Sequence, residues 1–102
     1  MRDVYSAVAD PTRRQLLRLL ADADELPLHE ITARFGMGRT AISKHLAVLK
    51  EAGLVVDRKV GRETRYQLNA APLREIQEWA AFYERFWTKR IDNLKSLLEE
   101  SV

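Results

Sequence analysis

Residues 38–55 read Gly38-Arg-Thr-Ala-Ile-Ser-Lys-His-Leu-Ala-Val-Leu-Lys-Glu-Ala-Gly-Leu-Val55, and this stretch decides the fold. Ile42, Leu46 and Leu49 recur at the spacing of one helical face, which predicts an apolar stripe packed against a core. The opposite face carries small and hydrogen-bonding side chains and a lysine, with no bulky apolar group at its centre. Such a face can lie close to a polar, negatively charged surface. We therefore expect a helix over residues 39–52 that enters a groove of DNA.

A shorter amphipathic helix is expected just before this one, at residues 28–35. Leu28, Ile31 and Phe35 fall on one of its faces. The Gly36-Met-Gly38 turn that follows is just long enough to set two helices at a steep angle. A short helix, a glycine-containing turn and a second helix are typical of a helix-turn-helix motif.

The period of the sequence changes to that of β-strands between residues 54 and 68. Two alternating runs flank Gly61, which predicts a two-stranded β-hairpin with a short turn. A two-stranded hairpin is marginally stable alone, so this one should pack on the helices. A basic hairpin beside a helix-turn-helix motif is the winged-helix arrangement, in which the hairpin contacts phosphate or a minor groove. The cations near its tip are Arg58, Lys59, Arg62 and Arg65.

Two helices are expected at the N-terminal end, over residues 2–9 and 11–22. Asp10 suits an N-cap and Pro11 the first helical position. The leucines of the second helix form a broad face for the core. Its arginines are expected on a solvated face; they are Arg13, Arg14 and Arg18.

The last expected helix covers residues 72–100, without glycine or proline, and would be a rod of roughly 40 Å. Five of the eight aromatic residues lie between 79 and 87, which is more apolar girth than one packing contact needs. A thick core within one chain is the alternative, but we expect a homodimer, with either apolar face meeting the partner. The expected interface residues are Val4, Tyr5, Trp79, Phe82, Tyr83, Phe86, Trp87, Ile91, Leu94 and Leu98.

Composition and charge limit the possible functions. The 102 residues make one domain, and the absence of cysteine excludes disulfides and thiolate metal sites. No run approaches the ~18 apolar residues of a membrane span, and no signal peptide is evident, so we expect the cytoplasm. Residues 39–65 carry seven cations and three anions, whereas the rest has ten cations and twelve anions. This basic middle is typical of polyanion binding, with a merely solvated basic surface as the alternative.

Three segments carry a family resemblance: Ala9-Asp-Pro-Thr-Arg-Arg14, residues 41–55, and Gly61-Arg-Glu-Thr-Arg-Tyr-Gln-Leu-Asn69. With the order of elements, they resemble the ArsR/SmtB family of bacterial winged-helix repressors. The resemblance implies a single domain over residues 1–102, mainly α with a two-stranded hairpin and a long C-terminal dimerisation helix. It also implies a homodimer that binds an inverted-repeat operator on double-stranded DNA and represses its own or a neighbouring operon.

The resemblance further implies which side chains face DNA. Arg39 and Lys44 are the candidates for guanine, since arginine or lysine to guanine is the commonest specific major-groove contact. Thr40 and Ser43 suit phosphate or mixed contacts. His45 lies near the apolar stripe, where packing and DNA contact are equally expected. The full expected DNA-binding set is Arg39, Thr40, Ser43, Lys44, His45, Arg58, Lys59, Arg62 and Arg65, of which the last four are salt-sensitive contacts of the wing.

The chain departs from the metal sensors of this family. Where they have Glu-Leu-Cys-x-Cys, it has Glu25-Leu-Pro-Leu-His29, so both thiolates are missing. A second family site uses Asp and His on the C-terminal helices, and here Asp92 has no histidine near it in the sequence. Zn²⁺ needs about four converging ligands. We therefore expect a member of the cysteine-free, non-metal-sensing branch of the family, which binds no metal or cofactor. The sequence does not indicate an effector. Gly38 also stands where the family often has an N-capping serine.

The sequence favours two other function classes less. A winged-helix module for protein interaction, without DNA binding, is the alternative, but the cations and hydroxyls of residues 40–51 argue against it. An enzyme is not expected, because the sequence has no cysteine, no Gly-rich phosphate loop and no convergent carboxylates with a base.

Overall fold

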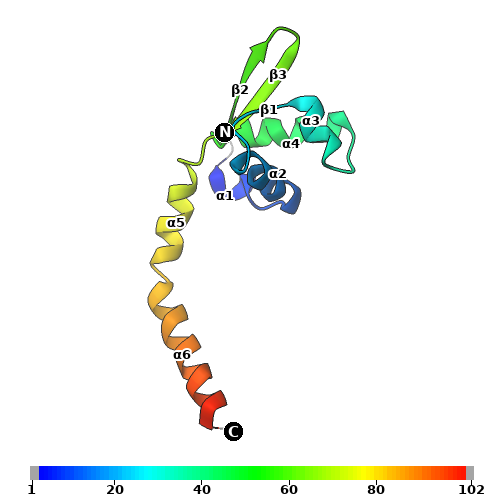
Figure 1. Ribbon diagram of the computed structural model, residues 1–102. Coiled ribbons are helices and arrows are strands. Elements are labelled where there is room, and N and C mark those ends of the chain that lie inside the picture. Colours follow the sequence, from blue (N-terminus) through cyan, green and yellow to red (C-terminus); the bar gives the residue numbers. More distant parts are fainter. Residues whose placement is uncertain (1–2, 101–102) are drawn as a thin grey trace.

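The computed structural model of the chain describes residues 3–100, except for the side chains of residues 88, 89, 91 and 100. A body of four helices and a small sheet carries a hairpin on one side and a long helical arm on the other (Figure 1). The elements in chain order are α1 (Val4–Ala7), α2 (Pro11–Ala21), β1 (Leu26–Pro27), α3 (Leu28–Ala33), α4 (Arg39–Glu51), β2 (Val55–Val60), β3 (Glu63–Leu68), α5 (Leu73–Ala81) and α6 (Glu84–Glu100).

The start of α2 is fixed by its first residues and by the end of α1. Asp10 is the N-cap, and its carboxylate accepts the backbone N–H of Arg13 at 3.0 Å, with Pro11 in the first turn. Arg13 Nε and Arg14 Nη1 each donate at 2.7 Å, to the carbonyl oxygens of Ala7 and Val8 respectively. The arginines that the sequence suggests are solvated therefore include two that hold α1 onto α2, because α1 ends with unpaired carbonyls beside them.

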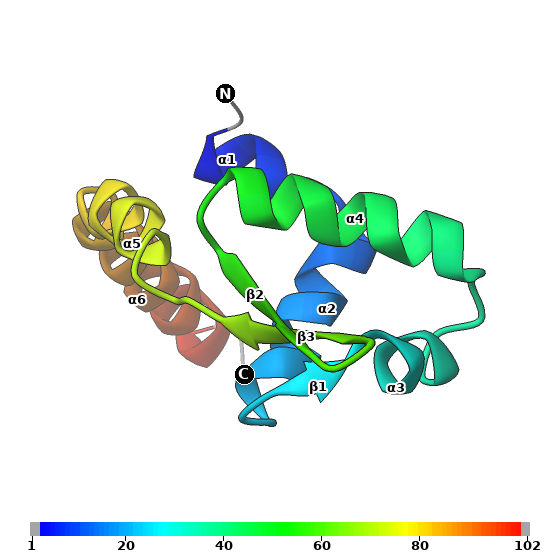
Figure 2. The same ribbon diagram turned by 90° about the horizontal axis from the view of Figure 1, so that it is seen from above.

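Helices α3 and α4 form the helix-turn-helix, with Gly38 as the N-cap of α4. The apolar stripe of α4 is buried as expected, because it packs on α2 and α3 (Figure 2). Gly53 ends the helix at φ +79°. The N–H groups of Gly53 and Leu54 donate to the carbonyls of Lys50 and Leu49 at 3.0 and 2.9 Å. These two bonds define a Schellman motif, which turns the chain directly from α4 into the hairpin.

The sheet has three antiparallel strands in the order β1-β3-β2, whereas the sequence predicts only the β2–β3 hairpin. The hairpin itself is present, with Gly61 at φ +63° in its turn. The additional strand pairs Leu26 with Tyr66 and Pro27 with Arg65. Two residues cannot show a strand period, and proline fits an edge strand because it needs no donor there. β1 therefore becomes visible only through its pairing with β3.

The C-terminal arm is two helices rather than the single helix expected over residues 72–100. The break falls at Phe82 and Tyr83, where Tyr83 N–H donates to the carbonyl of Ala80 at 2.9 Å, three residues back. Such tightening of a helix to an i−3 bond is a local 3₁₀ turn. These adjacent aromatic residues are weaker helix formers than the alanines before them and the glutamate after them, which favours a break here. The arm makes the molecule 64 Å long and only 29 Å wide.

The core lies between α1, α2, α3, α4 and the base of the sheet. Val4 belongs to it with 3% of its surface exposed, which corrects the expectation that Val4 faces a partner subunit. Its side chain has no free surface because α1 is fixed against α2. The other buried apolar residues are Ala7, Leu16, Leu17, Leu20, Leu26, Leu28, Ile31, Ile42, Leu46, Leu49, Leu54 and Val55. Among the described helices, none is long and apolar enough to cross a membrane.

Candidate nucleic-acid interface

The face of α4 opposite the core is open to solvent. Arg39, Thr40 and Lys44 are exposed on it, and Ser43 is half-buried beside them. Ala47 is also exposed and adds no bulk in the middle of the face. The structure thus brings these expected DNA-binding residues together on one accessible helical surface. A helix of this kind fits the width of a major groove.

His45 points toward the body rather than along this face. Its side chain is 20% exposed, and Nδ1 lies 3.4 Å from Arg13 Nη1 and 4.0 Å from the carboxylate of Asp10. The Arg13 N–H is the donor, and the imidazole nitrogen accepts when Nδ1 is unprotonated. The backbone N–H of Arg13, helped by the charges of His45 and Arg13, holds the pKa of Asp10 below its usual value. His45 therefore has a packing role between α4 and the start of α2.

The hairpin is joined to the end of α4 by an ion pair. Lys50 Nζ lies 3.0 Å from Asp57 Oδ1 and 3.1 Å from Oδ2. Tyr66 is the cross-strand partner of Asp57 and is half-buried, and burial is the main cause of its raised pKa. The ion pair between Lys50 and Asp57 holds the wing next to the C-terminal end of α4.

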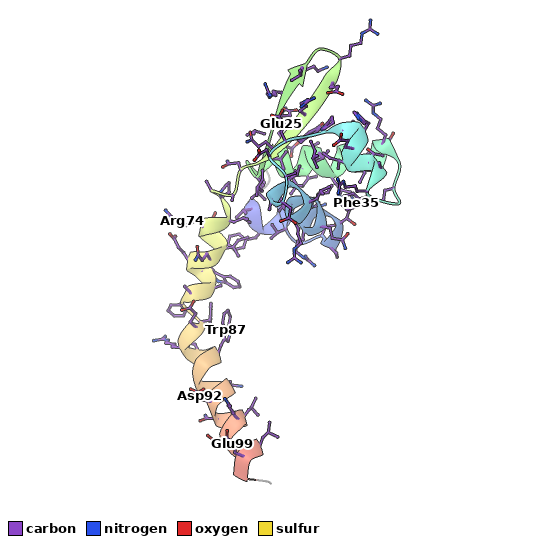
Figure 3. The ribbon with its side chains drawn as sticks, in the orientation of Figure 1. Glu25, Phe35, Arg74, Trp87, Asp92 and Glu99 are labelled. Atoms are coloured by element: carbon purple, nitrogen blue, oxygen red, sulfur yellow. The ribbon has the colours of Figure 1, made fainter. Side chains whose placement is uncertain are left out.

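Two of the four expected wing cations bind acidic side chains of the protein itself. Arg58 donates two hydrogen bonds to the Glu25 carboxylate, from Nε at 2.8 Å and Nη2 at 2.9 Å. Arg65 donates to Glu63 at 3.1 and 3.2 Å, and its Nη1 lies 3.8 Å from Glu25. The hydrogen bond from Arg58 is the main cause of a lowered pKa of Glu25 and has its counterpart in a raised pKa of Arg58. Figure 3 shows Glu25 at the base of the hairpin.

The other two wing cations lie at the tip and are exposed. Neither Lys59 nor Arg62 has a hydrogen bond or ion pair with any residue that the structure describes. The four cations that look alike in the sequence thus differ in what they can offer a polyanion. The contact of Arg58 and Arg65 with DNA remains a prediction from the sequence, and in the structure their guanidinium groups are already bound.

The two histidines and Asp92 lie in separate parts of the structure. His29 Nδ1 lies 3.9 Å from Glu63 Oε1, at the turn end of β3. Within residues 3–100, no group of three or more His, Asp or Glu side chains is placed to hold a metal ion. Asp92 lies far down α6 (Figure 3), away from both histidine-bearing helices of the body.

The helical arm carries a large exposed apolar strip. Tyr5 packs its ring edge-on to Trp79 at 6.0 Å and donates to the carbonyl of Glu75, which fixes α1 to α5. Arg85 lies 4.9 Å over the rings of both Phe82 and Phe86. The side chain of Ile91, also expected at the interface, lies outside the described residues. The large apolar side chains exposed on the arm are Trp79, Phe82, Tyr83, Phe86, Trp87, Leu94, Leu97 and Leu98.

Sequence reasoning did not single out Glu25 or Arg13 as parts of this interface. The signal for Glu25 is a pair of arginines at positions that face each other across the hairpin, since such a pair needs a counter-charge. The signal for Arg13 is its place three residues after an N-cap aspartate, at the junction of two helices. Each depends on knowing which elements meet in space.

Known proteins match this chain over most of its length. Residues 10–56 match the family described as "Bacterial regulatory protein, arsR family". The transcriptional repressor SdpR of Bacillus subtilis is 35% identical over 79 residues, covering 78% of this chain and 87% of SdpR. The regulator Rv2034 of Mycobacterium tuberculosis is 35% identical over 95 residues, covering 93% of this chain and 85% of Rv2034.

The likeness extends to solved structures. A crystal structure of a possible transcriptional regulator for arsenical resistance superposes with a TM-score of 0.72 and 38% identity, covering 94% of this chain and 96% of that one. A regulator from Rhodococcus sp. RHA1 has a TM-score of 0.68 and 33% identity, with 92% and 88% covered. The chain therefore belongs to the ArsR family of bacterial regulatory proteins, and it is a DNA-binding transcriptional regulator and not an enzyme.

Proposed function

We propose that the chain acts in the cytoplasm as a homodimeric repressor that binds an inverted-repeat operator in its own or a neighbouring operon. The observation that carries the proposal is the exposed face of α4 beside the free cations of the wing tip. Arg39 or Lys44 would contact guanine, with Thr40 and Ser43 on phosphate or bases. Lys59 and Arg62 would contact the backbone or the minor groove.

The length of α4 supports the proposal of a second subunit. One helix of 13 residues contacts only a few base pairs, and two copies at a fixed distance read two half-sites. The apolar strip of α5 and α6 would supply the surface for this pairing, because seven of its large side chains are at least 48% exposed. Exposed apolar surface of this extent is a mark of an interaction site. Tyr5 would join the interface through its contact with Trp79.

We also propose that repression does not respond to metal. The run Glu25-Leu-Pro-Leu-His29 lacks both thiolates of the family's metal sensors, and its glutamate already binds Arg58. Any relief of repression would then act through another ligand or a change in protein concentration.

The test is a footprint on DNA upstream of the gene, with and without added Zn²⁺ and with chelator. The expected result is protection of an inverted repeat with half-sites about one helical turn apart, unchanged by metal. Lys44→Ala should weaken the free energy of binding to the operator by about 1–3 kcal/mol, and protection should weaken with it. Arg74→Ala, on the exposed side of α5 away from α4, is the matched control and should leave it unchanged (Figure 3). Binding without sequence preference would overturn the repressor proposal, and loss of the footprint with Zn²⁺ would overturn the metal proposal.

A further inference from the structure

The two strands of the hairpin place an arginine pair on one of its faces. Arg58 and Arg65 are direct cross-strand partners, so their side chains project from the same face. Like charges in this arrangement destabilise a sheet unless a counter-charge is present. Glu25 supplies it, because β1 lies beside β3 and brings Pro27 opposite Arg65. The loop before β1 thereby places one carboxylate between two guanidinium groups.

This ion cluster is closed on itself. Glu25 receives two hydrogen bonds from Arg58 and lies 3.8 Å from Arg65, while Glu63 binds the other side of Arg65. Two cations and two anions leave no net charge on this face of the wing. The side chain of Glu25 is only 17% exposed, against 65% for Arg58. The carboxylate is therefore the enclosed member of the cluster and the guanidinium groups surround it.

The free cations of the wing lie elsewhere. Lys59 pairs with Thr64, on the hairpin face that also carries Asp57 and Tyr66. That face is turned toward α4, as the contact between Lys50 and Asp57 shows. Arg62 follows Gly61 in the turn. Lys59, on the face turned toward α4, and Arg62, in the turn, are thus the wing cations without an acidic partner among the described residues.

We propose that Glu25 limits the phosphate contacts of the wing, because it keeps Arg58 and Arg65 in the ion cluster when the protein is on DNA. Lys59 and Arg62 then make the wing's phosphate contacts. Phosphate contacts are independent of sequence, so withholding two cations from DNA lowers the affinity for any duplex and makes binding less dependent on salt. This inference rests on the proposed function and adds a residue outside the DNA-contacting surface to it.

Exchange of partners during binding is unfavourable for the cluster. If Arg58 moved from Glu25 to a phosphate, one bidentate charge-assisted pair would replace another. Glu25 would then be left enclosed with only the more distant Arg65 beside it, close to the negative charge of DNA. A carboxylate that loses its partner in a partly enclosed place keeps its desolvation cost. The cluster therefore remains closed.

The test is the salt dependence of binding to the operator and to a random duplex. Glu25→Gln should steepen the slope of log K against log salt by up to about 0.9 for each cation freed. The affinity for both duplexes should rise at low salt, because the freed cations would contact phosphate in either one. Asp24→Asn is the matched control: it removes one negative charge from the adjacent exposed residue and should leave the slope unchanged. Glu25→Gln combined with Arg58→Gln and Arg65→Gln should return to the wild-type slope.

A second pair of variants keeps the test independent of the folding of Glu25→Gln. Arg58→Gln should leave the slope unchanged, whereas Lys59→Gln, its neighbour on the opposite face, should lower it by about 0.9. Equal losses for Arg58→Gln and Lys59→Gln would overturn the inference, as would equal slopes for Glu25→Gln and Asp24→Asn. In both cases operator binding by the wild type would leave the proposed function standing. Absence of any duplex binding by the wild type would contradict the proposed function itself and, with it, this inference.

Discussion

Arg13 Nη1 in α2 lies 3.4 Å from His45 Nδ1 in α4, so one arginine joins the start of α2 to α4. The same guanidinium donates to the carbonyl oxygens of Ala7 and Ser6 at 2.7 and 3.2 Å. Arg13 thus contacts both the helix proposed for DNA reading and the short helix that packs on the helical arm. The Asp10-Pro-Thr-Arg-Arg14 segment therefore has a structural role: it joins α1, α2 and α4.

Replacing Arg13 with alanine should lower the free energy of unfolding by about 1–3 kcal/mol, because the last carbonyls of α1 lose their donors. Urea denaturation followed by circular dichroism measures it. Arg18→Ala, on the same helix, is the control, since the Arg18 side chain is exposed and has no hydrogen bond to a described residue. Equal effects of the two substitutions would contradict the role given to Arg13.

The pH dependence of stability should report the N-cap of α2. The pKa of Asp10 is lowered in the folded protein, mainly by the N–H of Arg13, so its contribution is present above the unfolded pKa of about 3.9. The contribution is lost as pH falls through the folded value. Asp10→Asn keeps a capping oxygen but removes the charge. The stability difference between wild type and Asp10→Asn should be present above about pH 5 and shrink as pH falls through the folded pKa of Asp10. A difference independent of pH down to about pH 2 would contradict this assignment.

Gly53 should resist substitution where Gly36 does not. Gly53 has φ +79°, and an added Cβ would lie 3.6 Å from Pro72, so Gly53→Ala should cost about 1 kcal/mol through backbone strain. At Gly36 an added Cβ meets nothing within 4 Å and φ is not positive, so Gly36→Ala should be neutral or slightly stabilising. Chemical denaturation of both variants decides the point. A neutral Gly53→Ala would show that the Schellman motif tolerates a side chain.

The parts of the fold that the sequence predicts are those written in local patterns. The apolar stripe of α4, the Asp10-Pro11 start and the left-handed Gly53 each depend on neighbours a few residues away. The strand β1 and the Glu25–Arg58 pair do not, since partners 33 residues apart meet only after the sheet forms. The break at Phe82 and Tyr83 escapes prediction because neither glycine nor proline marks it.

In the candidate site, too, the sequence predicts the local features and not the long-range contacts. Exposure of Arg39, Thr40 and Lys44 follows from helical periodicity, so it can be read from the sequence. That Arg58 is paired with a carboxylate and Lys59 is not, among the residues that the structure describes, cannot be read from the sequence. Alternation along a strand does not tell which face of the hairpin meets an acidic neighbour. The orientation of His45 depends likewise on Arg13, which lies in another helix.

Dimerisation through the arm should depend on its exposed aromatic residues. Trp87 is 52% exposed, and Trp87→Ala should raise the dimer dissociation constant at least about tenfold, since buried tryptophans are frequent interface hot spots. Analytical ultracentrifugation over a concentration series measures the change. Gln77→Ala on α5 is the control and should leave it within about twofold. A dimer unaffected by Trp87→Ala would exclude this part of the arm from the interface.

Selection of duplexes from a random library by the purified protein tests whether two copies of α4 read the operator. The expected result is enrichment of an inverted repeat with half-site centres about 10–10.5 base pairs, or a multiple of this, apart. Lys44→Ala should lose the enrichment, while Arg74→Ala should retain it. A selected pool with no common sequence, or a single half-site bound by a monomer, would contradict the claim that two copies of α4 read the operator.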